Sequence, residues 1–142
     1  MGRLKTDFLD LGDIKIAYRE FGSGPALILL HGNSAREEMF RKYQARYFNT
    51  FHTFTLDSRG HGQTISKDTS YSIEQYSGDV IRFCRAKGIT EACVIGHSDG
   101  GNIGLFLALK EPDIFKKLVL ISPNYKASGT EEKTLQFFKM GI

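Results

Sequence analysis

The segment Gly96-His97-Ser98-Asp99-Gly100 places a serine between two glycines in the pattern G-x-S-x-G. An apolar, strand-like run precedes it, and a helical pattern begins near residue 99. A sharp strand-to-helix turn would lift the Ser98 hydroxyl above a sheet, and the N–H groups at the start of the helix would stabilise a negatively charged intermediate. We therefore predict that Ser98 is a nucleophile, against the alternative of a glycine-rich turn with a chance serine.

An acyl-transfer intermediate needs a second N–H donor opposite the nucleophile. His31-Gly32-Asn33 follows a buried apolar run, so we predict that the backbone N–H groups of Asn33 and Asp99 form an oxyanion hole. Further residues near this loop, or after the last strand, are candidates for contact with the substrate. They are His31, Gly32, Met39, Phe40 and Tyr125, and for the apolar ones simple packing is an equally open reading.

A second polar loop, Asp57-Ser58-Arg59-Gly60-His61-Gly62, follows another apolar strand. Asp57 and Arg59 could tie this loop to its neighbours by charge-assisted hydrogen bonds, and we favour that structural role over a catalytic one. His61 is not our candidate for a catalytic base.

The apolar periodicity predicts strands that alternate with helices. We predict strands at 14–21, 26–31, 51–57, 91–96 and 117–122, and helices at 99–110 and within 36–48. Ser72 and Gln75 form a capping box for a further helix, which Lys87-Gly88 ends. The predicted fold class is α/β, with a mainly parallel sheet, helices on both faces and an antiparallel hairpin near residues 7–21 at the edge.

The composition and the charge limit the classes of function that the chain can have. The 142 residues fit one domain, and the net charge of +3 is spread without a dense Lys/Arg stripe, which argues against a nucleic-acid partner. Cys84 and Cys93 have no metal-ligand spacing and read as buried thiols. No apolar run approaches a membrane span and the N-terminus lacks a signal-peptide pattern, so we expect a cytoplasmic protein without membrane contact, metal or cofactor.

Taken together and in this order, the motifs at 31–33, 57–62 and 96–101 resemble those of the α/β-hydrolase superfamily. Residues 98–102 and Ser122-Pro123-Asn124-Tyr125 look like the biphenyl hydrolase-like (valacyclovir hydrolase) branch and like small bacterial carboxylesterases. The resemblance implies hydrolysis of a small-molecule ester or similar acyl bond through an acyl-enzyme on Ser98, with no cofactor. Epoxide hydrolases and haloalkane dehalogenases of this fold carry aspartate at the nucleophile position. Thr64 stands where members usually have serine.

The resemblance also implies a triad in the chain order serine, acid, histidine, in a protein of about 250 residues. Here all four histidines precede Ser98. We therefore expect residues 1–123 to be the N-terminal portion of a hydrolase core that lacks its last strands, and residues 124–142 to begin a lid. The chain alone should then be inactive, because the triad acid and histidine are absent.

Other readings stay open. The chain could be a non-catalytic half-domain that self-associates or assembles with another chain through the strand edge at 117–122. A separate chain could supply the acid and the histidine. An acyltransferase, an enol-lactonase or a C–C hydrolase would use the same motifs.

Overall fold

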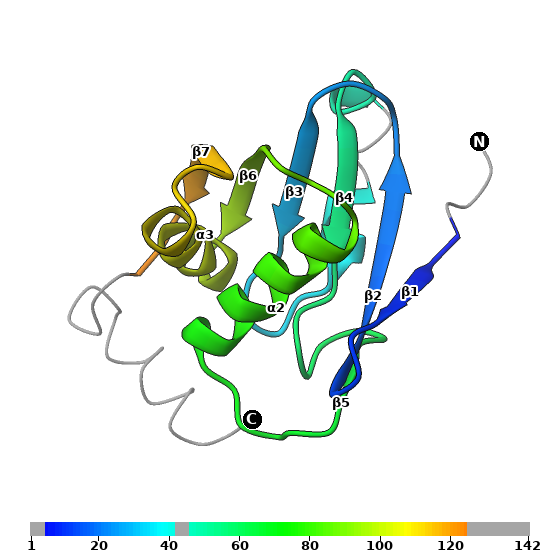
Figure 1. The fold of residues 1–142 in the computed structure, drawn as a ribbon, viewed down its shortest axis with the longest axis vertical. Helices are drawn as coiled ribbons and strands as arrows, with labels where there is room; N and C mark the ends of the chain where they lie inside the picture. Colours follow the sequence, from blue (N-terminus) through cyan, green and yellow to red (C-terminus); the bar gives the residue numbers. More distant parts are fainter. Residues whose placement is uncertain (1–4, 42–45, 125–142) are drawn as a thin grey trace.

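The computed structural model describes residues 5–41 and 46–124 as one mixed sheet with helices packed against it (Figure 1). The strands are β1 (Asp7–Asp10), β2 (Ile14–Phe21), β3 (Ala26–Leu30), β4 (His52–Leu56), β5 (Ile65–Ser66), β6 (Ala92–His97) and β7 (Phe115–Ile121). Their order is β1-β2-β4-β3-β6-β7, and β5 pairs with β2. The strands from β4 to β7 in this order are parallel, and β2 is antiparallel to β1, β4 and β5. The α/β class and the edge hairpin are confirmed.

The register of the central strands decides where the loops meet. Leu30, at the end of β3, pairs with Leu56 of β4 on one side and with Gly96 of β6 on the other. Because parallel strands end at the same edge of a sheet, the segments that follow these three residues start side by side. All three predicted motifs begin there.

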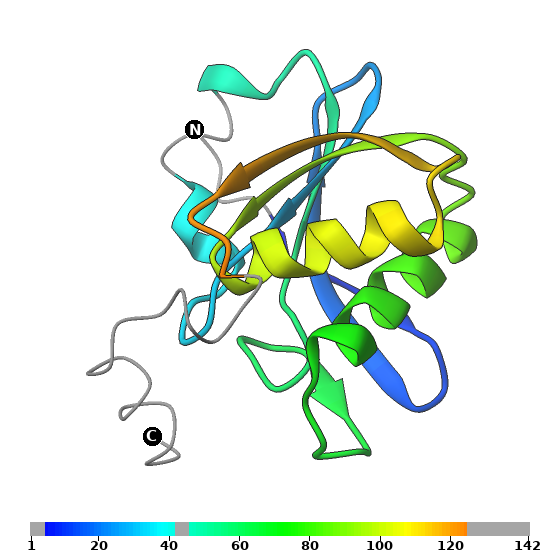
Figure 2. The same cartoon turned by 90° about the vertical axis from the view of Figure 1, so that its left-hand side faces the viewer.

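Two α-helices, α2 (Ile73–Ala86) and α3 (Asp99–Lys110), pack beside each other on one face of the sheet (Figure 2). The short helix η1 (Glu37–Phe40) lies on the opposite face, within the segment 36–48 where a helix is predicted, and residues 42–45 of that segment lie outside the described residues. The predicted N-cap of α2 is confirmed, since Ser72 accepts a hydrogen bond from the Gln75 N–H at 3.1 Å. The reciprocal half of the capping box is wrong, because the Gln75 side chain bonds to Asp68 and Ser70 instead.

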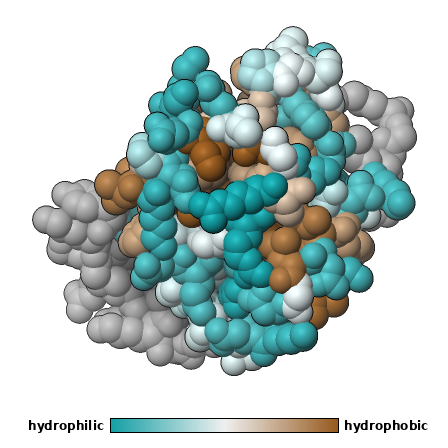
Figure 3. All heavy atoms as spheres, viewed as in Figure 1, coloured by the Kyte–Doolittle hydropathy of each residue, from teal (hydrophilic) through white to brown (hydrophobic). Residues whose placement is uncertain are grey.

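The two faces of the sheet are covered unequally. Between the sheet and the α-helices lies a large core in which Phe54 and Phe83 are fully buried. The core on the other face is small and centres on Leu27, Leu29 and Phe40. Hydrophobic patches remain on the surface that carries α2 and α3 (Figure 3). No helix in the described part of the chain has the length and apolar character needed to cross a membrane.

Candidate active site

The predicted nucleophile sits on a strained turn between β6 and α3. Ser98 has φ 52° and ψ −115°, on the positive-φ side that a non-glycine residue seldom adopts. Its N–H donates to the Ile121 carbonyl at 2.8 Å, and its own carbonyl accepts from the N–H groups of Gly101 at 2.8 Å and Asn102 at 3.1 Å. Hydrogen bonds on both sides of the residue therefore hold the backbone in this conformation.

The glycines of G-x-S-x-G are required by close backbone packing. A Cβ atom on Gly100 would lie 2.2 Å from the Leu30 carbonyl oxygen, and one on Gly96 would lie 2.2 Å from the Gly100 oxygen. Real Cβ atoms do not approach backbone that closely, so the first turn of α3 rests on the end of β3 only because both side chains are missing.

The predicted oxyanion loop lies against this turn. A Cβ atom on Gly32 would be 3.1 Å from the Ser98 Cβ, so the loop passes directly beside the nucleophile. Within the described residues, neither the Asn33 N–H nor the Asp99 N–H has a backbone acceptor. Asp99 is the first residue of α3, where an N–H is free by the geometry of a helix. This arrangement is compatible with two oxyanion donors, whose role stays a prediction.

His31 joins two loops, and its predicted contact with substrate stays a prediction. Its side chain is buried, its Nε2 accepts from the Ser58 N–H at 3.0 Å, and its Nδ1 donates to the Gly32 carbonyl at 2.8 Å. Burial lowers its pKa and favours this neutral, doubly engaged ring. Both nitrogens are thus occupied, and the Nε2 contact joins the loop after β3 to the loop after β4.

Of the other residues predicted to contact the substrate, Phe40 and Met39 lie in or against the small core, and Tyr125 lies outside the described residues. Phe40 is buried and packs on Leu27 and Leu29, so the packing reading applies to it. Met39 is half-buried against the same small core. Tyr125 and nearly all of the predicted lid segment lie outside the described residues.

The loop at 57–63 is anchored as predicted for a structural element. Asp57 accepts from the Glu37 N–H at 2.8 Å and from the Gln63 N–H at 2.9 Å. Arg59 forms a two-pronged ion pair with Asp79 of α2, with both N–O distances at 2.9 Å, and both side chains are buried. The hydrogen bond to Asp79 raises the pKa of Arg59. Sequence reasoning did not identify Asp79 as the partner.

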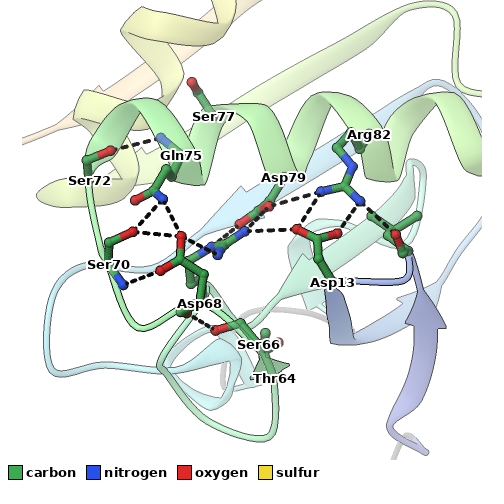
Figure 4. A network of polar contacts seen from close by, with 12 residues as sticks. Asp13, Thr64, Ser66, Asp68, Ser70, Ser72, Gln75, Ser77, Asp79 and Arg82 are labelled. Carbon is green, nitrogen blue, oxygen red and sulfur yellow. Dashed lines mark hydrogen bonds and ion pairs between the residues drawn. The ribbon is translucent and has the colours of Figure 1, made fainter.

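This ion pair belongs to a larger network (Figure 4). Arg82, one turn further along α2, bonds to Asp13 in the turn before β2, and that hydrogen bond lowers the pKa of Asp13 to about 2. Asp68 lies on the side of Arg59 away from Arg82, where it bonds to Ser70 and Gln75. The network joins α2 to the β1–β2 turn and to the loops after β4.

Thr64 supplies the hydroxyl that its position needs. Its Oγ1 donates to the Asp57 carbonyl at 2.7 Å and accepts from the Ala17 N–H at 2.9 Å. Serine could make the same two hydrogen bonds, so the departure from the superfamily pattern leaves this contact intact.

None of the four histidines hydrogen-bonds to the Ser98 hydroxyl. His52 starts β4, at the opposite end of the parallel strands, and bonds to Glu20 at 2.7 Å. The Nδ1 atom of His97 is buried against Gly32 without a partner in the described part of the chain. His61 faces the oxyanion loop, where its Nε2 lies 3.4 Å from the Asn33 Oδ1.

The described residues contain no group of three or more His, Cys, Asp or Glu side chains that could hold a metal ion. Cys84 and Cys93 are free thiols; burial raises the pKa of Cys84 to about 12, where it is inert at neutral pH. The expectation of buried thiols holds for Cys84, while Cys93 is half-buried.

Residues 25–140 match the family described as alpha/beta hydrolase fold. The chain belongs to this family. The parallel order of β4, β3, β6 and β7 and the turn at Ser98 agree with that membership.

Several known proteins are similar to the chain. The 2-(acetamidomethylene)succinate hydrolase of Mesorhizobium japonicum is 32% identical over 113 residues, which are 80% of this chain and 41% of that protein. A fluoroacetate dehalogenase of a Burkholderia species is 30% identical, over 82% of this chain and 41% of that protein. The solved structure of a bacterial membrane phospholipase A matches with a TM-score of 0.85 and 27% identity, over 98% of this chain and 46% of that one. The chain thus spans less than half the length of the curated relatives it matches.

Proposed function

We propose that this chain provides the nucleophile and the oxyanion hole of a serine hydrolase that acts on a small-molecule ester or similar acyl bond. The observation that carries the proposal is the conformation of Ser98. A serine held at φ 52° over the N-terminus of α3, with Gly32 against its Cβ, stands where an attacking hydroxyl and two N–H donors would converge. Strain at a non-glycine residue is retained where function needs the geometry.

The chemistry follows from these positions. The Ser98 oxygen attacks the substrate carbonyl and loses its proton, and the carbonyl oxygen becomes an anion that the N–H groups of Asn33 and Asp99 stabilise. The leaving alcohol then departs with a proton, and water later releases the acid from the acyl-enzyme. Position 98 carries serine, whereas the epoxide hydrolases and dehalogenases of the superfamily carry aspartate there and form an alkyl ester on its carboxylate. The serine therefore favours an acyl-enzyme over an alkyl-enzyme ester.

The proton of Ser98 requires a base, and the described residues do not place one beside it. His31, His61 and His52 are engaged with other partners, and His97 lies against Gly32. We infer that efficient turnover uses an acid and a histidine outside this chain, either in the length that the relatives have beyond the match or on a second polypeptide. The chain by itself should show slow acylation and little turnover.

Incubation with 4-nitrophenyl acetate, followed by mass spectrometry of the intact protein and its peptides, tests the nucleophile. Slow, Ser98-specific acetylation that disappears in Ser98→Ala is expected. Acetylation that is equal in Ser98→Ala would contradict the role of Ser98. Steady turnover at the rate of an ordinary esterase, abolished by Ser98→Ala, would contradict the need for an outside base.

A non-catalytic assembly unit is the second candidate, and the β7 edge favours it. Among the described strands β7 pairs with β6 on one side, and its Val119 and Ile121 side chains are 54% and 45% exposed. An edge strand with exposed apolar side chains invites pairing with another chain. Sedimentation equilibrium that shows a concentration-dependent dimer would support this candidate, and a monomer at high concentration would contradict it.

A further inference from the structure

The loop after β3 and the loop after β4 are joined at their bases by two hydrogen bonds. The Ser58 N–H donates to His31 Nε2 at 3.0 Å, and the Glu37 N–H donates to the Asp57 carboxylate at 2.8 Å. His31, Glu37 and Asp57 are buried, so these two links fix the ends of the segment 31–37. The middle of that segment carries Asn33, whose backbone N–H is the predicted oxyanion donor.

The middle of the segment is strained and exposed. Ser34 has φ 59°, which a non-glycine residue adopts at a cost, and Asn33 is exposed. The Asn33 Oδ1 accepts from the Ser34 N–H at 2.9 Å, a local contact that fixes which side-chain atom is the oxygen. Such a conformation persists when the surroundings hold it, and His61 is the described side chain from the other loop that reaches it.

The hydrogen bonds around His61 define what its ring can donate. Its Nδ1 lies 3.0 Å from the Arg59 carbonyl, which can only accept, so a proton on this nitrogen is donated to Arg59. Its Nε2 lies 3.4 Å from the Asn33 Oδ1, which also accepts. A proton on Nε2 is likewise donated to the Asn33 Oδ1.

Asp99, His31 and Tyr76 lie around the His61 ring. Asp99, at the start of α3, interacts electrostatically with His61, and its own half-buried carboxyl has a pKa that burial raises and His61 lowers. The neutral His31 ring lies 5.1 Å away and the Tyr76 ring of α2 lies 6.2 Å away. The charge of Arg59, in the same loop as His61, is paired with Asp79.

We propose that His61 is a positioning residue for the oxyanion hole: it donates from Nε2 to the Asn33 side chain and thereby holds the Asn33 N–H beside Ser98. The two buried links set where the segment begins and ends, and a backbone hydrogen bond from the Ala35 N–H to the Gly32 carbonyl at 3.2 Å closes the turn between them. His61 holds the Asn33 side chain on that turn. The contact between His61 and Asn33 is a feature of the structure whatever the function is. Its importance for catalysis rests on the proposed serine-hydrolase function.

The test compares His61→Leu with His61→Gln in the ¹⁵N-labelled chain. Leucine removes the donor, whereas the glutamine amide can donate to Asn33. We expect His61→Leu to shift the amide signals of Asn33 and Ser34. It should also speed the hydrogen exchange of the Ser34 N–H, which donates to the Asn33 side chain, about tenfold, since a loop held by few hydrogen bonds opens easily. His61→Gln should restore both properties, and His52→Gln, at the far end of the sheet, should leave them unchanged.

A second variant separates positioning from general damage. Asn33→Ala removes the acceptor of both the Ser34 N–H and His61, so it should shift the Ser34 signal further than His61→Leu does. Adding His61→Leu to it should cause no additional shift, because the acceptor that His61 uses is already gone. Unchanged Asn33 and Ser34 signals in His61→Leu, or a glutamine variant that behaves like leucine, would overturn the proposal.

The rate of Ser98 acetylation by 4-nitrophenyl acetate supplies a separate readout. It should fall about tenfold in His61→Leu and recover in His61→Gln, less than the loss on removing an oxyanion donor outright. If the wild type shows no Ser98-specific acetylation while the amide signals respond as expected, the proposed function fails and the positioning contact stands. If acetylation is normal in His61→Leu, the positioning role fails and the proposed function stands.

Discussion

Two regions of the molecule, one around β4 and the other at the β7 edge of the sheet, differ in which side chains they bury. Around β4, α2 and the 57–63 loop, charged side chains are buried in pairs, as Arg59 is with Asp79. At β7 the pattern is reversed: apolar Val119 and Ile121 are exposed, and the ion pair of that region, Lys116 with Glu91, lies in solvent. We call the first region, around β4, α2 and the 57–63 loop, the closed region, because its charged side chains are buried against one another. We call the β7 edge the open region, because its apolar side chains are exposed.

The contrast has a physical cause. A buried charge is tolerated when every polar atom around it is engaged, and the contacts of α2 with the loops provide that for Arg59. An exposed valine costs little alone, but several on one edge favour association. The candidate active site belongs to the closed region through Asp57 and His31 and borders the open one through Ser98, whose N–H donates to Ile121 of β7.

The largest expected effect is at the turn that joins the two regions. Gly100→Ala places a Cβ atom 2.2 Å from the Leu30 carbonyl oxygen, so it should destabilise the fold by about 4 kcal/mol or more, or prevent folding. The matched control is Gly78→Ala in α2, where a Cβ meets no atom within 4 Å, and which should stabilise by about 0.5–1 kcal/mol. Urea denaturation followed by circular dichroism measures both. Similar stabilities for the two variants would contradict the close-packing account of the turn.

The next effect compares the buried ion pair with the exposed one. Asp79→Ala leaves the Arg59 guanidinium buried without its partner and should cost about 3–5 kcal/mol of unfolding free energy. Glu91→Ala breaks the Lys116 pair, whose side chains are 52% and 64% exposed, and should cost at most about 1 kcal/mol. Denaturant titrations in low and high salt provide the measurement. Equal losses would mean that the closed region is not held by its buried charges.

A change at β7 should affect association while it leaves folding nearly unaltered. Val119→Lys places a charge on the open edge and should reduce any dimer severalfold, with stability within about 0.5 kcal/mol of the wild type. Ile65→Lys is the control, because Ile65 is 66% exposed but lies on β5. Sedimentation equilibrium compares the two, and an equal response to both changes would remove the special role of β7.

The smallest expected effect is a pH dependence at the rim of the closed region. The Arg82 hydrogen bond lowers the pKa of Asp13 from 3.8 to about 2, so its stabilising contribution is present above pH 3.8 and is lost as pH falls toward about 2. Because Asp13 is half exposed, the contribution is small. Asp13→Asn should therefore flatten the loss of stability across that interval. Acid titration of the thermal midpoint would contradict this if both proteins fell with the same slope.

Much of the fold could be predicted because its signals are local. The alternation in residues 14–21 gave β2 with its observed bounds, and Ser72 gave the N-cap of α2. The two-residue strand β5 escaped prediction, since Ile65–Ser66 is too short to show a period and forms through pairing with β2. His61 and Asn33 are 28 positions apart in the sequence, so no local sequence pattern predicts their contact.

The sequence by itself indicated the turn between β6 and α3, because the pattern G-x-S-x-G and the change from an apolar strand to a helical pattern are local signals. Gly96 is required by the backbone of Gly100, four residues further on, whereas Gly100 is required by Leu30 of β3. The sequence also determined the α/β class, through apolar periods that each element carries alone. Tertiary structure alone decided which polar side chains meet. Examples are the Arg59–Asp79 ion pair, the hydrogen bond between Ser58 and His31, and the contact of His61 with Asn33. They form because the parallel register of β3, β4 and β6 brings distant loops to one edge of the sheet.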